Sequence, residues 1–248
     1  MLEAMQVETI GTGPRLVLVH GSVGNGRSTW EAQLPLADRF TLVIPNRPGS
    51  PPNPPVERVD FEEHAPLMAE LLEDGAHLVG HSYGGVISLY AAGLRPGAVR
   101  SLTVIEPPAF GIASRDPAVA ALVAELDPLW SNEGPRDPAV FLSEFSSRVI
   151  GRQVSPQRTL TPELEQGVRT LMVERNPWEA DPPLAELRAA PFPKLVVSGA
   201  HSAAFDAVCD VLEQRLDAER AVLPGAAHNA QRAPGFNERL EEFLAGTS

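Results

Sequence analysis

Apolar and polar residues alternate with two different periods along the chain. Six short apolar runs have the length and composition of buried strands: 16–20, 41–44, 76–80, 101–105, 194–198 and 220–223. Five further stretches carry apolar residues at helical spacing: 30–40, 60–72, 86–94, 203–216 and 237–244. Strands that alternate with helices favour β-α-β units, and therefore predict an α/β fold with a mainly parallel sheet.

The middle of the chain lacks these strand patterns. From residue 107 to 190 the sequence has scattered prolines and amphipathic helical stretches, such as 119–126 and 138–149. We therefore expect a helical cap at 107–190, inserted into a core formed by residues 1–106 and 191–248.

Composition excludes several classes of protein. With 43% hydrophobic residues, the 248-residue chain can bury a sizeable core, which excludes intrinsic disorder. The formal net charge is -12 and no basic run occurs, whereas nucleic-acid binding requires clustered lysine and arginine. Cys209 is the single cysteine, so no intrachain disulfide can form.

No segment has the pattern of an export signal or a membrane span. The first residues lack the basic segment and apolar run of a signal peptide, and no apolar run reaches the ~18 residues that cross a bilayer. We therefore expect a cytoplasmic protein that acts on a small-molecule substrate, without nucleic-acid or membrane partners. The sequence leaves a homodimer open.

The most informative segment is Gly80-His81-Ser82-Tyr83-Gly84, which stands between an apolar strand and a helix. A serine on so sharp a turn needs a strained backbone, and glycine two residues to either side removes the clashes. Such a turn exposes the serine hydroxyl and leaves the amide of Tyr83 at the positive end of the helix. Ser82 is therefore the candidate nucleophile.

A second glycine-rich loop, His20-Gly21-Ser22-Val23-Gly24, follows the first predicted strand directly. Acyl transfer develops negative charge on a carbonyl oxygen, and two backbone amides aimed at that oxygen stabilise it. This pattern makes the amides of Ser22 and Tyr83 the candidate oxyanion hole. We interpret His20 as a structural hydrogen-bonding residue.

His228 lies in a loop, Pro-Gly-Ala-Ala-His, just after the last predicted strand. A general base must reach the serine hydroxyl, and a loop beyond a strand end allows this, so His228 is the candidate base. The other five histidines are His20, His64, His77, His81 and His201. None of the six forms a ligand spacing such as H-E-x-x-H, so the sequence predicts no metal and no cofactor.

Taken together, these segments resemble the α/β-hydrolase superfamily. The resemblance rests on the order His-Gly-x-x-Gly, Trp30, Arg47-Pro48-Gly49, Gly-His-Ser-x-Gly-Gly, and a loop histidine near the C-terminus. It covers residues 15–106 and 192–244. Within the superfamily the motifs are similar to those of small esterases, lactonases, cofactor-free peroxidases and carbon–carbon bond hydrolases. The resemblance implies the α/β-hydrolase fold, and the serine at position 82 disfavours branches with an aspartate nucleophile.

The expected acid of a catalytic triad departs from the family pattern. Members usually carry it after the second-last strand as Gly-x-x-Asp, and here that stretch reads Gly-Ala-His-Ser and ends at Ser202. Some members instead place the acid at the end of the strand after the nucleophile helix, which is Glu106 here. A buried carboxylate at that position would be costly without a polar partner. We therefore predict a triad of Ser82, Glu106 and His228, with Asp206, or a dyad without an acid, as alternatives.

The predicted activity is that of a serine hydrolase. It would cleave an ester, thioester or lactone of a small-to-medium, partly apolar substrate through an acyl-enzyme on Ser82. Four aromatic residues are candidates for the cavity wall or for the cap core: Phe110, Trp130, Phe141 and Trp178. Two other interpretations stay open. The same residues would serve carbon–carbon cleavage, acyl transfer or cyclisation, or the protein would bind a ligand with weak or no turnover.

Overall fold

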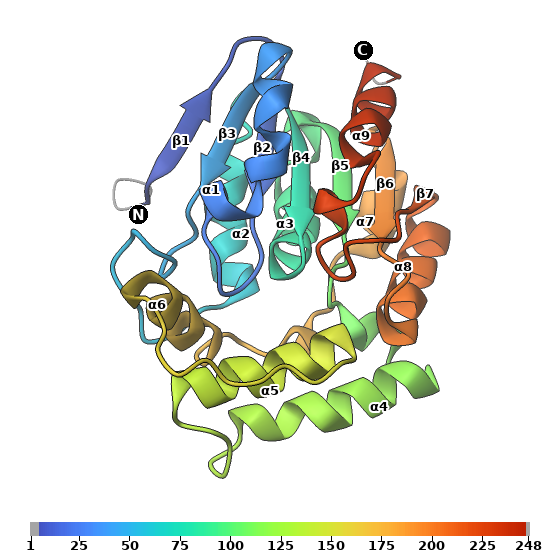
Figure 1. The fold of residues 1–248 in the computed structure, drawn as a ribbon. Coiled ribbons are helices and arrows are strands. Elements are labelled where there is room, and N and C mark those ends of the chain that lie inside the picture. Colours follow the sequence, from blue (N-terminus) through green and yellow to red (C-terminus); the bar gives the residue numbers. More distant parts are fainter. Residues whose placement is uncertain (1–4, 247–248) are drawn as a thin grey trace.

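A computed structural model describes residues 5–246 and contains one seven-stranded sheet (Figure 1). Its strands are β1 Val7–Ile10, β2 Arg15–Val19, β3 Thr41–Pro45, β4 Ala76–His81, β5 Val99–Ile105, β6 Lys194–Ser198 and β7 Glu219–Val222. They lie in the order β1-β3-β2-β4-β5-β6-β7, and every neighbouring pair is parallel except β1 with β3. The predicted fold class, a mostly parallel sheet flanked by helices, is confirmed.

The predicted strands are all present, each within two residues of its predicted bounds. The structure adds β1, which the sequence analysis did not predict. This strand has four residues and pairs antiparallel with β3 at the edge of the sheet, where none of its residues is fully buried. An edge strand of this kind needs no apolar run, and its sequence, Val-Glu-Thr-Ile, contains none.

Side chains along the parallel strands alternate between two hydrophobic clusters. In β2, Leu16 and Leu18 belong to one cluster, whereas Val17 and Val19 belong to the other. The first cluster includes residues of the C-terminal helix Phe236–Ala245, and the second includes residues of the helices after β3 and β4. Because both faces of the sheet are covered, its central strands read as continuous apolar runs.

Four α-helices outside the segment between β5 and β6 follow the predicted pattern, namely α2 Phe61–Glu70, α3 Tyr83–Leu94, α8 Ala203–Leu216 and α9 Phe236–Ala245. The short helix α1 Gly26–Thr29 was not predicted. Asp60 caps α2, since its carboxylate accepts a hydrogen bond from the backbone N–H of Glu62 at 2.8 Å. The helical pattern at 30–40 forms a 3₁₀ helix, Glu31–Asp38, with Pro35 inside it.

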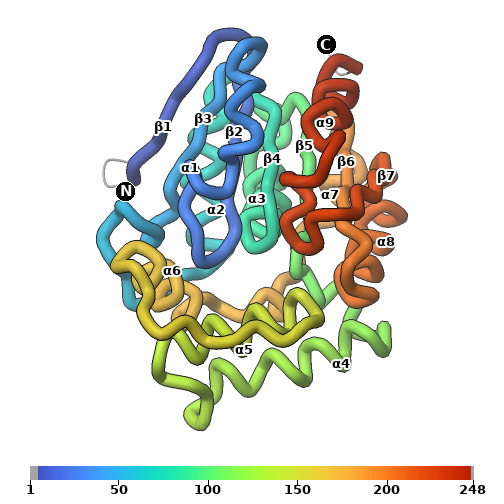
Figure 2. The backbone as a smooth tube through the Cα atoms, in the orientation of Figure 1, coloured from blue at the N-terminus to red at the C-terminus, as the bar shows by residue number. Residues whose placement is uncertain are grey.

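The segment between β5 and β6 is helical throughout its regular structure. Its α-helices are α4 Pro117–Leu126, α5 Pro138–Ile150, α6 Pro162–Leu171 and α7 Leu184–Ala189. The backbone trace shows α4, α5 and α6 lying together across one end of the sheet (Figure 2). The division into a core and a cap stays a prediction. Within the described residues, no helix is both long and apolar enough to span a membrane.

Two buried histidines, His64 and His77, have lowered pKa values. Burial, assisted by the positive charge of Arg100, lowers the pKa of His77 in β4 to about 4. Burial and the charge of Arg47 lower the pKa of His64 in α2 to about 3. Both histidines therefore stay neutral in the folded protein at pH values at which they would be protonated in an unfolded chain.

We expect the free energy of unfolding to decrease as the pH falls from about 6.5 towards 4, because the unfolded state binds more protons in this window. Each of the two histidines contributes roughly 1.4 kcal/mol per pH unit there. Urea unfolding over a pH series measures the slope in wild type and in His77→Gln, which keeps a hydrogen-bonding group beside Ser101. The variant should have the shallower slope; equal slopes would contradict the assignment.

Candidate active site

Ser82 stands on the turn between β4 and α3. Its backbone has φ 53° and ψ −126°, a conformation that few residues other than glycine adopt. A Cβ atom on Gly84 would overlap the carbonyl oxygens of Val19 and His20, and one on Gly80 would overlap the carbonyl of Gly84. Glycine at these two positions therefore lets α3 begin directly against the end of β2.

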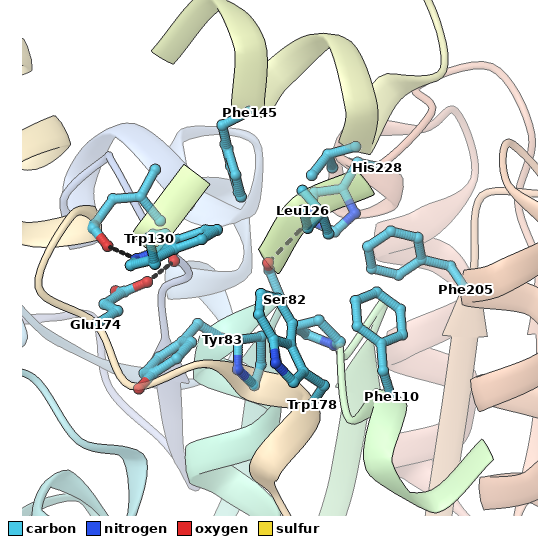
Figure 3. Close-up of a pocket in the computed structure, with 15 residues that line it drawn as sticks. Ser82, Tyr83, Phe110, Leu126, Trp130, Phe145, Glu174, Trp178, Phe205 and His228 are labelled. Atoms are coloured by element: carbon cyan, nitrogen blue, oxygen red, sulfur yellow. Dashed lines mark hydrogen bonds between the residues drawn. The ribbon is translucent and has the colours of Figure 1, made fainter. Parts of the chain in front are cut away.

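The loop after β7 brings His228 to Ser82. The Nε2 atom of His228 lies 2.9 Å from Oγ of Ser82, and the two side chains face each other in the close-up of the pocket (Figure 3). His81 holds this loop, since its Nε2 donates to the backbone carbonyl of His228 at 2.9 Å. An imidazole at this distance from a hydroxyl can accept its proton.

Glu106 follows β5 directly and is fully buried. Its Oε1 accepts a hydrogen bond from the backbone N–H of Gly199 at 2.5 Å. Its Oε2 lies 3.4 Å from Nδ1 of His228 and 3.3 Å from Nδ1 of His201. Burial opposes ionisation, but the two facing imidazoles outweigh it and lower the pKa of Glu106 to about 2. Glu106 is therefore ionised at neutral pH, beside the imidazole that contacts Ser82.

The two other positions considered for the triad acid, Ser202 and Asp206, both lie at the start of α8. Ser202 is the N-cap residue of α8, and Asp206 lies one turn further along that helix. The carboxylate of Asp206 lies 3.6 Å from the guanidinium of Arg220 and is partly exposed. Its position is that of a surface residue paired with a neighbouring cation.

Ser22 lies in the loop after β2, which is held by His20 and Arg47. The Nδ1 atom of His20 donates to the carbonyl of Gly21 at 2.7 Å, and its Nε2 accepts from the backbone N–H of Arg47 at 3.0 Å. Burial and the nearby guanidinium lower the pKa of His20, which favours the neutral ring that these two bonds require. Ser22 and Tyr83 both line the cavity at Ser82.

The arrangement of sheet, turn and loops agrees with a comparison against known families. The model of the alpha/beta hydrolase family matches residues 16–243. The chain belongs to this family. It is 30% identical over 233 residues to 2-succinyl-6-hydroxy-2,4-cyclohexadiene-1-carboxylate synthase of Enterobacter sp. (strain 638), over 88% of this chain and 86% of that relative.

Two further hydrolases are similar over different shares of the chain. Pimeloyl-[acyl-carrier protein] methyl ester esterase of Methylococcus capsulatus is 38% identical over 100 residues, which cover 40% of this chain and 39% of that relative. The match therefore spans less than half of that esterase. The crystal structure of an alpha/beta hydrolase from Sphaerobacter thermophilus covers 97% of this chain and 96% of its own, with a TM-score of 0.68 at 23% identity. It supports the fold alone.

This α/β hydrolase also buries a charge pair that the sequence analysis did not predict. Nη2 of Arg47 lies 2.9 Å from Oε1 of Glu174, and both side chains are almost fully buried. The other oxygen, Oε2, accepts the hydroxyl of Ser22 at 2.5 Å. Burial raises the pKa of Glu174, and Arg47 and Ser22 only partly offset it. Glu174 lies 152 residues from Ser22, so no local pattern could have linked them.

A mostly apolar cavity opens at Ser82 (Figure 3). Three of the four predicted aromatic wall residues line it, namely Phe110, Trp130 and Trp178. Phe141 instead packs edge-on against Trp130, with ring centroids 5.2 Å apart. Among the described residues that line the cavity there is no lysine or arginine. The hydrolase therefore presents its serine to a mostly apolar space without a fixed positive charge.

One group of side chains in the described part of this hydrolase has the composition of a metal site. Glu106, His201 and His228 each offer one ligand atom, and the three atoms lie within 4.8 Å of one another. The sequence analysis found no metal motif because the three residues come from three separate segments of the chain.

We expect Arg47→Met to lower the free energy of unfolding by about 3–5 kcal/mol, because it leaves Glu174 buried without its countercharge. The double variant Arg47→Met/Glu174→Gln leaves no charge behind and keeps an acceptor for Ser22. It should recover most of the lost stability. Denaturant unfolding of both variants measures the difference, and a double variant no more stable than the single one would contradict this account.

Proposed function

We propose that this protein is a serine hydrolase that cleaves an ester, thioester or lactone through an acyl-enzyme on Ser82. The observation that carries the proposal is the 2.9 Å contact between Oγ of Ser82 and Nε2 of His228 at an apolar cavity. Membership of the alpha/beta hydrolase family supports it, as does the esterase named among the relatives.

In the proposed first step, His228 takes the hydroxyl proton of Ser82 as the serine oxygen attacks the substrate carbonyl carbon. The carbonyl oxygen becomes an oxyanion, which accepts hydrogen bonds from the backbone amides of Ser22 and Tyr83. Two fixed donors of this kind typically contribute several kcal/mol to the transition state. The Arg47–Glu174 pair contributes indirectly, because it fixes the loop that carries Ser22.

In the proposed second step, the imidazolium of His228 gives its proton to the leaving oxygen or sulfur, and the carbonyl bond reforms as the acyl-enzyme. Water then attacks the acyl carbon, with His228 again taking a proton, and the carboxylic acid product leaves Ser82. Ionised Glu106 stabilises the imidazolium in both steps. Its 3.4 Å separation from Nδ1 of His228 is long for a hydrogen bond, and such contacts often tighten only when substrate is bound.

The cavity indicates which acyl groups are accepted. Its walls include Phe110, Trp130 and Trp178, and the described lining residues offer no cation to a charged acyl chain. Taking a carboxylate into such surroundings without a partner is costly. We therefore propose a small-to-medium, neutral and partly apolar acyl group. Most of these walls belong to the helical segment between β5 and β6, which would set the specificity.

A second candidate is carbon–carbon cleavage, acyl transfer or cyclisation by the same residues. It is favoured by the relative of Enterobacter sp., which matches over 88% of the chain and is named as a carboxylate synthase. The same absence of lysine and arginine from the described cavity lining speaks against binding a carboxylate here. Hydrolysis of a neutral ester therefore stays the first proposal.

The triad is tested by hydrolysis of a short p-nitrophenyl ester. Ser82→Ala should lower kcat by at least about 10⁴-fold, and Glu106→Gln by about 10²–10⁴-fold, because the imidazolium loses its supporting charge. Asp206→Asn is the matched control, since it also removes one carboxylate near the site, and it should leave kcat within a few-fold. A larger loss in Asp206→Asn than in Glu106→Gln would move the acid to Asp206.

The neutral-acyl preference is tested with two p-nitrophenyl esters of equal chain length, the butyrate and the anionic hemisuccinate. We expect kcat/KM for the anion to be at least about tenfold lower, because its carboxylate would enter the cavity unpaired. Faster turnover of the anionic ester would refute the preference and favour the chemistry of the carboxylate synthase.

A further inference from the structure

Three polar atoms beside the nucleophile point at one another and have no hydrogen-bond partner. They are Oε2 of Glu106, Nδ1 of His201 and Nδ1 of His228. Glu106 is fully buried, and the side chains of His201 and His228 are 6% and 14% exposed. Buried polar atoms without a partner are uncommon and call for an explanation.

The other polar atom of each of these three side chains is fully engaged. Oε1 of Glu106 accepts the N–H of Gly199 at 2.5 Å, and Nε2 of His201 lies 3.1 Å from the carbonyl of Val149 in α5. Nε2 of His228 contacts the hydroxyl of Ser82. Ligands of a metal ion characteristically have their outer atoms held in this way, because the outer bonds orient the inner ones.

The partner of His201 decides where its proton lies. A backbone carbonyl can only accept, so Nε2 of His201 carries the hydrogen that it donates to Val149. In the neutral ring, Nδ1 then presents a lone pair to the Glu106 carboxylate, 3.3 Å away. Two electron pairs facing each other in a buried site repel, so a cation must neutralise them. That cation is either a second proton on His201 or a metal ion.

The two Nδ1–Oε2 distances favour the metal ion, although the three ligand atoms together span up to 4.8 Å, so the two imidazole nitrogens would have to approach each other on binding. Charge-assisted N–H···O hydrogen bonds are about 2.7–2.9 Å long, whereas the two Nδ1–Oε2 separations are 3.3 and 3.4 Å. Zinc bonds of about 2.0–2.1 Å in a tetrahedron give ligand–ligand separations of about 3.3–3.4 Å. Two imidazoles and one carboxylate are also ligands that zinc prefers.

We propose that Glu106, His201 and His228 form a binding site for Zn²⁺ or a similar divalent transition metal. The metal would take Nδ1 of each histidine and Oε2 of the glutamate, and rotation of the imidazole rings would bring the two nitrogens to bonding distance. Water would complete the tetrahedron. His201 is the residue that turns a catalytic histidine–carboxylate pair into a three-ligand site.

Occupancy of this site would inhibit the hydrolase, a consequence that rests on the proposed function. A metal on Nδ1 of His228 confines the remaining ring proton to Nε2, which then donates to Oγ of Ser82. No lone pair is left to accept the serine proton, and Glu106 is held by the metal. The proposed metal is therefore a reversible inhibitor, and the binding itself does not depend on what reaction Ser82 performs.

Binding is measured on the intact protein by competition for Zn²⁺ with a chromophoric chelator. We expect one equivalent of Zn²⁺ to bind tightly. His201→Phe should lower the affinity for Zn²⁺ by more than about 100-fold, a larger loss than removal of a residue that only hydrogen-bonds to a ligand causes. Phenylalanine keeps the ring that packs against Phe205. Asp206→Asn is the matched control and should leave the affinity unchanged. His201→Ala serves as a second variant, with circular dichroism to verify that each variant is folded.

Inhibition is measured separately on the ester substrate, with each variant compared with its own rate in a chelator. Zn²⁺ should inhibit wild type and not His201→Phe, a chelator should restore the rate, and Mg²⁺ should have no effect because it prefers oxygen ligands. Zinc binding that is equally tight in His201→Phe would overturn the proposal and leave His201 as a protonated partner of Glu106. Absence of any ester hydrolysis would overturn the proposed function alone, since the chelator competition still reports on the metal site.

Discussion

Contact between backbone segments at the Ser82 turn constrains the whole site. Gly84 lies against the carbonyls of Val19 and His20, so the start of α3 and the end of β2 touch where no side chain fits between them. The backbone N–H of Ser82 also donates to the carbonyl of Ile105 at 2.8 Å, which ties the turn to the end of β5. The three neighbouring strands β2, β4 and β5 thereby bring the Ser22 loop, Ser82 and Glu106 together where the carboxyl ends of these strands meet.

Two buried carboxylates near the cavity lie in different electrostatic surroundings. Glu106 faces imidazoles and a backbone amide, and its pKa is lowered to about 2 despite its burial. Glu174 faces a guanidinium and a hydroxyl, yet burial still raises its pKa. The first carboxylate supplies negative charge behind His228, whereas the second forms a pair with Arg47 that adds little net charge. The unpaired negative charge of the site therefore lies on Glu106, beside the imidazole that contacts Ser82.

Local patterns were sufficient to predict most of the fold and part of the candidate site. The parallel strands are buried on both faces and read as apolar runs, and Ser82 lies between two glycines that its turn requires. The position of His228 followed from its loop after the last strand. By contrast, β1 is an edge strand without an apolar run, and a helical pattern does not tell the 3₁₀ geometry of Glu31–Asp38 from an α-helix.

Contacts between distant segments could not be predicted in the same way. Arg47 meets Glu174, and Glu106 meets His201, only because the chain folds these segments onto one edge of the sheet. A charged residue in a single sequence gives no sign of whether it will be buried. The one available signal was chemical: a carboxylate directly after a buried strand, as at Glu106, must find polar partners, although the sequence does not say which.

The helical segment that covers the cavity leaves the sheet after β5 and returns at β6, and these two strands are direct neighbours. Its two ends are therefore anchored side by side by the pairing of Leu102 with Lys194 and of Ile105 with Val197. Changes within this segment that spare Glu174, the partner of Arg47, leave the strand pairing at its ends intact, and lengthening a flexible loop costs only about 0.6 kcal/mol per doubling. Substitutions in one contiguous stretch of the chain can thus reshape the cavity walls while the strands that precede Ser82 and Glu106 keep their pairing.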